Sequence, residues 1–157
     1  MTYNRLCFIY ILIHLLIRIE SFTPEVRHAH SSVLVGNKLY IFGGKNETAY
    51  TNEVFYLDVS QQFDTGLPPW TDLTLNSGIG FRSGWSTTVA LNDDNDDPTI
   101  FLIGGFMFDK YSDKDAFTSL VHRFNPKFGQ WDALIISGKE PDRRRDIQAV
   151  ADDSGKI

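Results

Sequence analysis

The segment that decides the fold reads Lys38-Leu39-Tyr40-Ile41-Phe42-Gly43-Gly44. Its central run is apolar without polar alternation, which predicts a strand buried on both faces, as in sheets that stack on one another. The glycine pair permits positive φ angles and a close backbone approach directly after the strand. Just upstream, Gly36-Asn37 suits a two-residue hairpin turn, so we expect a preceding strand over Ser31 to Val35.

The same pattern returns further along the chain, which indicates an internal repeat. Leu102-Ile103-Gly104-Gly105 repeats the apolar run and its glycine pair, and Trp131 repeats Trp70. Upstream of each glycine pair, the segment that begins at Arg27 aligns with the one at Arg82, and a third copy begins at Arg145. The sequence stops in the middle of this third unit, so we expect an N-terminal fragment of a longer repeat protein.

Each complete unit holds four expected strands, which is the content of one propeller blade. In the first unit the strands run from Ser31 to Val35, Lys38 to Phe42, Glu53 to Val59 and Trp70 to Leu73. In the second they run from Ser86 to Leu91, Thr99 to Ile103, Ser119 to Phe124 and Gln130 to Ile135. The connecting segments differ in length, which is typical of surface loops on a fixed scaffold.

These features resemble the kelch family. Its marks are an apolar strand that closes on a double glycine, an aromatic-rich third strand that ends in a turn, and a tryptophan that opens the fourth strand. The chain shows them as Gly43-Gly44, Val54 to Asp58 and Trp70, and again as Gly104-Gly105, Val121 to Pro126 and Trp131. The resemblance implies an all-β fold, a partial kelch-type β-propeller with about two four-stranded blades and the start of a third. The type that it resembles is the secreted one with a galactose-oxidase-like central domain.

The repeated residues are predicted to have structural roles, because they fit their strand and turn positions without any ligand. The arginines that open the units either anchor the strand entries by hydrogen bonding to carbonyls or line one propeller mouth and bind anions; recurrence in every unit favours the anchor. Trp85 and Gln148 stand in the place of His30, and Arg123 in that of Tyr56, so these positions do not share one function. The predicted structural repeat residues are Gly43, Gly44, Gly104, Gly105, Trp70, Trp131, Arg27, Arg82 and Arg145.

The first residues differ from everything after them. A short basic start is followed by an apolar run from Leu6 to Ile17, which is shorter than the ~20 residues of a membrane span but suits a signal-peptide core. We therefore expect a signal peptide over 1–21, propeller blades over 22–157, and a secreted protein or one on the extracellular face of the membrane. The alternative is a buried N-terminal strand or helix of the fold. A membrane anchor is expected only outside this chain.

The charge and the cysteine content exclude two classes of function. The net charge is −5, and the basic run Arg143-Arg144-Arg145 is flanked by Asp142 and Asp146, so no nucleic-acid partner is expected. The single cysteine, Cys7, lies inside the expected signal segment. The mature chain would then have no disulfide and no thiolate ligand.

No constellation of residues predicts catalysis, a metal site or a cofactor. Copper radical oxidases of the kelch type use a cysteine linked to a tyrosine, and the mature chain lacks a cysteine. His28 and His30 alternate in an extended segment, so their side chains point to opposite faces. The acidic run Asp93 to Asp97 begins like a calcium loop, but Pro98 stands where such a loop needs glycine, so a solvated hairpin loop is expected.

One modification site is predicted. Asn46-Glu47-Thr48 is an N-glycosylation sequon in the loop that follows the first glycine pair. In a secreted chain this position would be modified at Asn46. The alternative is an unmodified polar turn.

The predicted function is extracellular recognition of a protein or a glycan. Stacked blades would supply the scaffold, and the variable loops at 45–52, 92–98 and 106–118 would supply the contacts. The alternative is a fragment of a propeller enzyme, galactose-oxidase-like or carbohydrate-active, whose catalytic residues lie beyond Ile157. A likeness of fold alone does not decide between them.

Overall fold

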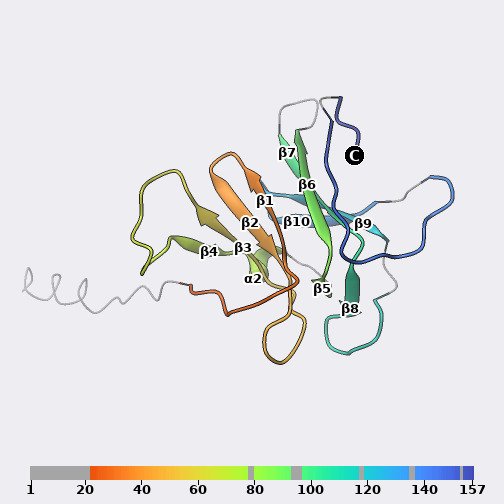
Figure 1. The fold of residues 1–157 in the computed structure, drawn as a ribbon, viewed down its shortest axis with the longest axis horizontal. Helices are drawn as coiled ribbons and strands as arrows, with labels where there is room; N and C mark the ends of the chain where they lie inside the picture. The colour runs from red at the N-terminus through yellow and green to blue at the C-terminus, as the bar shows by residue number, and fades with distance from the viewer. Residues whose placement is uncertain (1–21, 78–79, 93–96, 117–118, 135–136, 153) are drawn as a thin grey trace, which may run out of the picture.

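The computed structural model describes residues 22–77, 80–92, 97–116, 119–134, 137–152 and 154–157. Two four-stranded antiparallel sheets lie side by side and make up most of this part of the chain (Figure 1). Such sheets, stacked in sequence order, form a partial kelch-type β-propeller, and the all-β prediction is confirmed. The expected signal segment 1–21 lies outside the described residues.

We call the two sheets the first and second blade. The first blade has the order β1-β2-β3-β4, formed by β1 (Ser31–Val35), β2 (Lys38–Phe42), β3 (Val54–Asp58) and β4 (Trp70–Asp72). The second blade has the order β6-β7-β9-β10, formed by β6 (Thr87–Asn92), β7 (Pro98–Ile103), β9 (Val121–Asn125) and β10 (Gln130–Ala133). In both blades each strand pairs with the next one of that blade, and β1 packs beside β6.

The predicted strands match the observed ones closely. The bounds of β1 and β2 are those expected, and the β1–β2 pair closes at Val35↔Lys38 around the Gly36-Asn37 turn. In the second blade β9 starts at Val121 and not at Ser119, and β10 ends at Ala133 while Ile135 lies outside the described residues. These differences lie at strand ends, where sequence periodicity carries least information.

One small sheet was not predicted. Strand β5 (Phe81–Gly84) pairs with β8 (Phe106–Asp109), and a single helical turn, α2 (Thr74–Ser77), precedes them. The prediction of one continuous loop over 106–118 is therefore wrong in its first part. Both strands are too short for an alternating pattern to show, because four residues give only two positions on each face.

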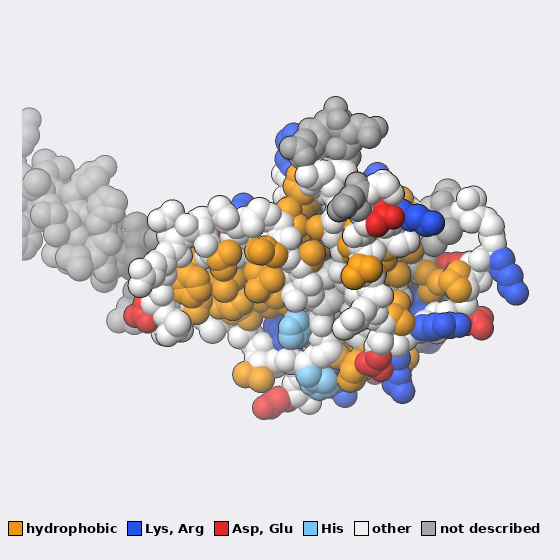
Figure 2. Space-filling model, turned by 45° about the horizontal axis from the view of Figure 1, so that its top comes forward, with side chains coloured by type: hydrophobic (Ala, Val, Ile, Leu, Met, Phe, Trp, Pro, Cys, Tyr) orange, Lys and Arg blue, Asp and Glu red, His pale blue; other side chains and the backbone are white. Residues whose placement is uncertain are grey.

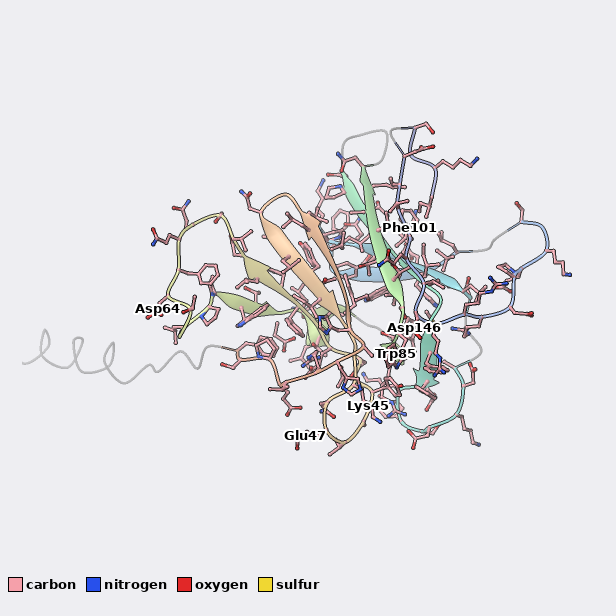
Figure 3. The ribbon with its side chains drawn as sticks, viewed as in Figure 1. Lys45, Glu47, Asp64, Trp85, Phe101 and Asp146 are labelled. Carbon is pink, nitrogen blue, oxygen red and sulfur yellow. The ribbon has the colours of Figure 1, made fainter. Side chains whose placement is uncertain are left out.

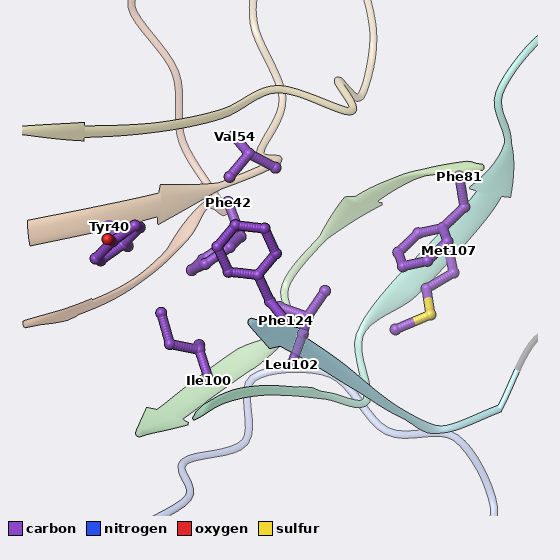
Figure 4. Close-up of a cluster of buried hydrophobic side chains, with 8 residues drawn as sticks. All are labelled: Tyr40, Phe42, Val54, Phe81, Ile100, Leu102, Met107 and Phe124. Carbon is purple, nitrogen blue, oxygen red and sulfur yellow. The ribbon is translucent and has the colours of Figure 1, made fainter. Parts of the chain in front are cut away.

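The core lies between the two blades. Eight buried side chains form one cluster, drawn in Figure 4: Tyr40, Phe42, Val54, Phe81, Ile100, Leu102, Met107 and Phe124. Three successive residues of β2 are buried, with exposed fractions of 4% for Tyr40, 6% for Ile41 and 1% for Phe42. Since neighbouring strand residues point to opposite faces, the prediction of burial on both faces is confirmed for this strand.

The two tryptophans of the repeat have different surroundings. Trp131 packs against Phe42 of the first blade, so it lies where the blades meet. Trp70 packs against Phe55, on the face of the first blade that is turned away from the second. Phe22 also contacts Phe55 there, with 5.4 Å between ring centroids. In Figure 2 hydrophobic side chains gather over the first blade.

The blade entries, 26–30, 82–86 and 143–147, are shifted relative to the alignment of their arginines. A residue with positive φ marks each entry: Ala29 at 57°, Trp85 at 60° and Asp146 at 54°. In this register Arg27 aligns with Ser83 and not with Arg82, which corrects the sequence alignment. Trp85 then takes the place of Ala29 and not that of His30. The misalignment looked regular because Arg82 and Arg145 each lie one position away from the residue that aligns with Arg27.

Candidate loop-end interaction surface

The predicted contact loops do not share one end of the blades. The β2–β3 loop and the β7–β9 connection lie at the lower end in Figure 1, together with the blade entries. Isolated bridges tie them together there, between His28 and Lys45 and between Thr51 and Ser83. Of the third predicted loop, 92–98, the described residues Asn92, Asp97 and Pro98 lie at the opposite end, next to the Gly36-Asn37 turn, and 93–96 are outside the described part of the chain. We call the end with the entries the loop end.

The glycine pairs hold the entries against the loop end. The Gly44 amide donates to the Ser83 carbonyl oxygen at 2.8 Å, and the Gly105 amide donates to that of Arg144 at 2.7 Å. Gly43 has a φ of 57°, and a Cβ added to it would lie 2.4 Å from the Ser83 oxygen. Glycine is therefore needed here both for its backbone angle and for the close approach of the next entry.

The arginines of the repeat fall into two kinds. The Arg27 guanidinium donates to the Gly43 carbonyl oxygen at 3.1 Å and to the Thr51 hydroxyl at 3.2 Å, and it pairs with the Glu53 carboxylate. Arg82 donates to the Asp109 carbonyl oxygen at 3.1 Å. Arg145 is 61% exposed and lies 3.8 Å from Asp146. Arg27 and Arg82 thus anchor loop backbone, whereas Arg145 is a surface residue.

Aromatic side chains from several segments meet at the loop end. The Tyr50 ring lies 5.0 Å from Phe108 and 6.3 Å from Phe106, between centroids. The indole Nε1 of Trp85 donates to the Tyr50 hydroxyl at 3.1 Å. His28 meets the Trp85 ring edge-on at 6.3 Å. The loop-end surface, as we use the term, consists of His28, Lys45, Tyr50, Trp85, Phe106, Phe108 and Arg145.

Cations lie over these rings. Lys45 Nζ lies 5.7 Å from the Tyr50 centroid, and the Arg145 guanidinium lies 5.4 Å from that of Phe106. Figure 3 shows Lys45, Trp85 and Asp146 at the same end of the molecule, below strand β6. Tyrosine, tryptophan and arginine are the residues that most often dominate binding energy at protein interfaces. The loop-end surface holds one residue of each of these types, Tyr50, Trp85 and Arg145.

A turn beside the surface presents a further tyrosine. The Asp109 carboxylate accepts hydrogen bonds from the Tyr111 amide and from the Ser112 hydroxyl, both at 3.0 Å. These bonds, with that from the Tyr111 amide first, lower the pKa of Asp109, so its carboxylate stays ionised and keeps the turn closed. The Tyr111 side chain is 87% exposed at the tip of this turn.

The described residues hold no cluster of three or more histidine, cysteine, aspartate or glutamate side chains that could bind a metal ion. His28 contacts Trp85, whereas His30 lines a pocket next to Trp70. Asp97, the only described member of the acidic run, pairs with Lys127 at 2.9 Å. That no catalytic residue, metal or cofactor belongs to this chain stays a prediction.

Two hollows lie away from the loop end. A pocket of about 460 Å³ opens on the outer face of the first blade, next to Phe55 and Trp70. A groove of about 700 Å³ lies between the hairpin turns at the opposite end, with Lys38, Asp58 and Lys127 in its lining. In the groove each cation has an ionic or aromatic neighbour of its own, since Lys127 pairs with Asp97 and Lys38 lies over the Tyr56 ring. The described lining of neither hollow brings together as many aromatic rings as the loop-end surface does.

The predicted glycosylation site forms a closed turn. The Asn46 side-chain oxygen accepts hydrogen bonds from the Thr48 amide and hydroxyl, both at 3.0 Å, and from the Ala49 amide at 2.9 Å. Its Nδ2 donates to the Glu25 carboxylate at 2.7 Å, in an exposed position. The nitrogen that a glycan would modify is therefore at the surface of the turn.

The sequence predicted two of the loops that form this surface, 45–52 and 106–118, but not which of their residues meet Trp85. Tyr50, Phe106 and Phe108 were not singled out, because aromatic residues in loops look the same in sequence as those in edge strands. Trp85 was noted only as a departure from the repeat. The signal that could have found them is the number of aromatic residues within the two loops that follow the glycine pairs.

Comparison with known proteins gives the same fold as the geometry. The family described as KLHDC2/KLHL20/DRC7 Kelch-repeats domain matches residues 13–157. Kelch domain-containing protein 2 of Bos taurus is 31% identical over 100 residues, which cover 64% of this chain and 22% of that protein. Kelch domain-containing protein 3 of Bos taurus is 26% identical over 128 residues, covering 81% of this chain and 29% of that protein.

The chain is much shorter than these relatives. Kelch domain-containing protein 1 of Homo sapiens is 33% identical over 89 residues, and the match covers 19% of its length. The chain thus spans less than a third of each of these three proteins. Among the described residues no helix is long and apolar enough to cross a membrane. The family match covers most of the sequence, and the chain therefore belongs to the kelch-repeat family.

Proposed function

We propose that this chain recognises a partner protein through the loop-end surface. Kelch repeats typically serve as protein-interaction modules, and the blades supply a rigid scaffold for loops of different length. The observation that supports the proposal is the aromatic cluster around Tyr50, which joins two loops and one blade entry and has Lys45 at its edge. Exposed Tyr111 extends the same end of the molecule.

Site-directed photo-cross-linking tests the proposal. Benzoylphenylalanine is placed at Tyr111, at the loop end, and in a matched variant at Val59, which is 42% exposed. Val59 bonds to Asn37 in the β1–β2 turn and so lies at the opposite end. We expect discrete cross-linked proteins from the Tyr111 variant alone. Equal labelling from both positions would contradict the proposal, and binding to a glycan array that is lost in Tyr50→Ala would favour a glycan.

We propose further that the protein is exported by residues 1–21. The apolar run from Leu6 to Ile17 supports this, although the family match begins at residue 13 and so overlaps the segment. Expression of the full chain in a secreting eukaryotic cell should give medium in which the protein begins at Phe22. A protein that stays in the cell with its N-terminus intact would favour the alternative, in which the segment belongs to the fold.

Modification of Asn46 follows from export. Removal of N-glycans should shift the mass of the secreted chain, and the shift should be absent in Asn46→Gln. Thr48→Ser keeps the sequon and serves as the matched control. A secreted chain that shows no mass shift would leave Asn46 as an unmodified polar turn.

A further inference from the structure

Each blade entry contains one residue in the left-handed backbone region. These residues are Ala29, Trp85 and Asp146, with φ angles of 57°, 60° and 54°. Side chains of L-residues are disfavoured there, and a bulky one is a clear outlier. Glycine or asparagine would adopt this conformation at lower cost.

The left-handed angle recurs at the same place in each blade entry, and in the first two entries it lies next to the second glycine of the pair that follows. Gly44 meets the backbone on both sides of Ala29, since an added Cβ would lie 2.9 Å from the His28 oxygen and 3.1 Å from the His30 nitrogen. Gly105 meets the backbone around Trp85 in the same way, at 2.6 Å from the Gly84 oxygen and 2.5 Å from the Ser86 nitrogen. The conformation therefore recurs with an alanine, a tryptophan and an aspartate, and does not depend on the side chain.

The identity of the residue at position 85 needs a separate explanation. Trp85 is only partly buried and does not belong to the core cluster between the blades. Its two specific contacts, with the Tyr50 hydroxyl and the edge of His28, are with residues of the loop-end surface.

We infer that Trp85 is a specificity-determining residue of the loop-end surface and stacks on an apolar or aromatic side chain of the partner protein. This rests on the proposed function. The Nε1 hydrogen of the indole is already bonded to Tyr50, so the apolar ring is what remains for recognition. An indole fixed by a hydrogen bond loses little conformational entropy on binding, which is the property of an interface anchor.

A random dodecapeptide phage library, selected on the full chain, supplies a defined probe. Affinities of the selected peptides are then measured for wild type, Trp85→Gly, Trp85→Phe, Tyr111→Ala and the backbone control Ala29→Gly. We expect selected peptides to share an apolar or aromatic residue. Trp85→Gly should weaken binding about tenfold or more, Trp85→Phe should retain most of it, and Ala29→Gly should leave it unchanged.

Thermal stability separates this role from a structural one. Glycine relieves the backbone strain at position 85, so the Tm of Trp85→Gly should stay within about 4 °C of wild type. A Tm lower by more than about 8 °C, or a chain that does not fold, would show that Trp85 is needed for packing and overturn the inference. If binding of the selected peptides were lost in Tyr111→Ala but kept in Trp85→Gly, the inference about Trp85 would be overturned and the proposed function would stand. A library without any binder would count against the proposed function as well.

Discussion

The ring of Phe42 in the first blade meets the Trp131 indole of the second blade almost at a right angle, with 5.5 Å between centroids and 81° between planes. Phe124 approaches the same phenyl ring at 5.5 Å and 75°. Edge-to-face pairs of this kind add about 0.5–1.5 kcal/mol to the effect of burial. Phe42 thus joins the two sheets, and it directly precedes the glycine pair that receives the next entry.

Replacing Phe42 with alanine should destabilise the protein by about 4 kcal/mol, because a ring that is 1% exposed leaves a cavity between two rigid sheets. Chemical denaturation monitored by tryptophan fluorescence measures the change. Phe128→Ala is the matched control, since that ring is 64% exposed, and should change stability by less than about 0.5 kcal/mol. Equal effects of the two changes would mean that the blades do not stabilise each other.

Gly36 and Gly43 separate the effect of a backbone angle from that of a steric clash. Both have a φ of 57°, but a Cβ at Gly36 meets nothing within 4 Å, whereas one at Gly43 lies 2.4 Å from the Ser83 oxygen. Gly36→Ala should cost about 1–2 kcal/mol, the usual penalty for a left-handed L-residue. Gly43→Ala should cost clearly more, about 3 kcal/mol or above, because the entry of the second blade must also move. If the two variants had the same denaturation midpoint, the predicted extra cost of the steric clash at Gly43 would be contradicted.

The blades themselves were predictable from the sequence because their signals are local. The apolar run of β2, the Gly36-Asn37 turn and the glycine pairs each specify their own backbone, and the repeat shows them twice. The loop-end surface was not predictable in the same way. Tyr50, Trp85 and Phe108 are far apart in sequence, and they meet only because the entry of one blade packs on the loop of the previous one.

The register of the entries shows the same limit. Arginine occurs near the start of every unit, and identity alone aligns Arg27 with Arg82. The backbone instead aligns the left-handed residues Ala29 and Trp85. A φ angle leaves no trace in the sequence when the residue that adopts it is not glycine, so the shift of one position could be seen only in the structure.

The arginines of the repeat should differ sharply in their effect on stability. The Arg27 side chain is 5% exposed, pairs with Glu53 and lies over the Phe55 ring at 4.8 Å. Arg27→Ala leaves the Glu53 carboxylate partly buried without its partner and should destabilise the chain by about 3 kcal/mol. Arg145→Ala, at a position 61% exposed, should have an effect below about 0.5 kcal/mol. If Arg27→Ala and Arg145→Ala lowered the stability by similar amounts, the arginines of the repeat would share one structural role.

His122 is a polar ring in an apolar position. Strand pairing aligns it with Phe55 of the first blade, since Phe55 pairs with Ile41 and His122 with Leu102, each two residues before a glycine pair. His122 is 4% exposed, and its ring centroid lies 4.4 Å from that of Phe81. Burial lowers the pKa of His122; a backbone hydrogen bond with Ser119 opposes this, and the nearby Arg143 charge adds to it.

Stability should therefore fall as the pH is lowered below the ordinary histidine pKa of 6.5. In the folded state His122 stays neutral in this range, whereas in the unfolded state it binds a proton. Lowering the pH stabilises the state that binds more protons, which here is the unfolded state. The contribution is fully present above 6.5, declines below it, and stops changing once the folded-state pKa has been passed. Denaturation midpoints between pH 7.5 and 5 measure this slope. His122→Phe, which copies the first blade, should reduce it, and exposed His28→Ala should not. A slope that persists unchanged in His122→Phe would assign the acid sensitivity to other groups.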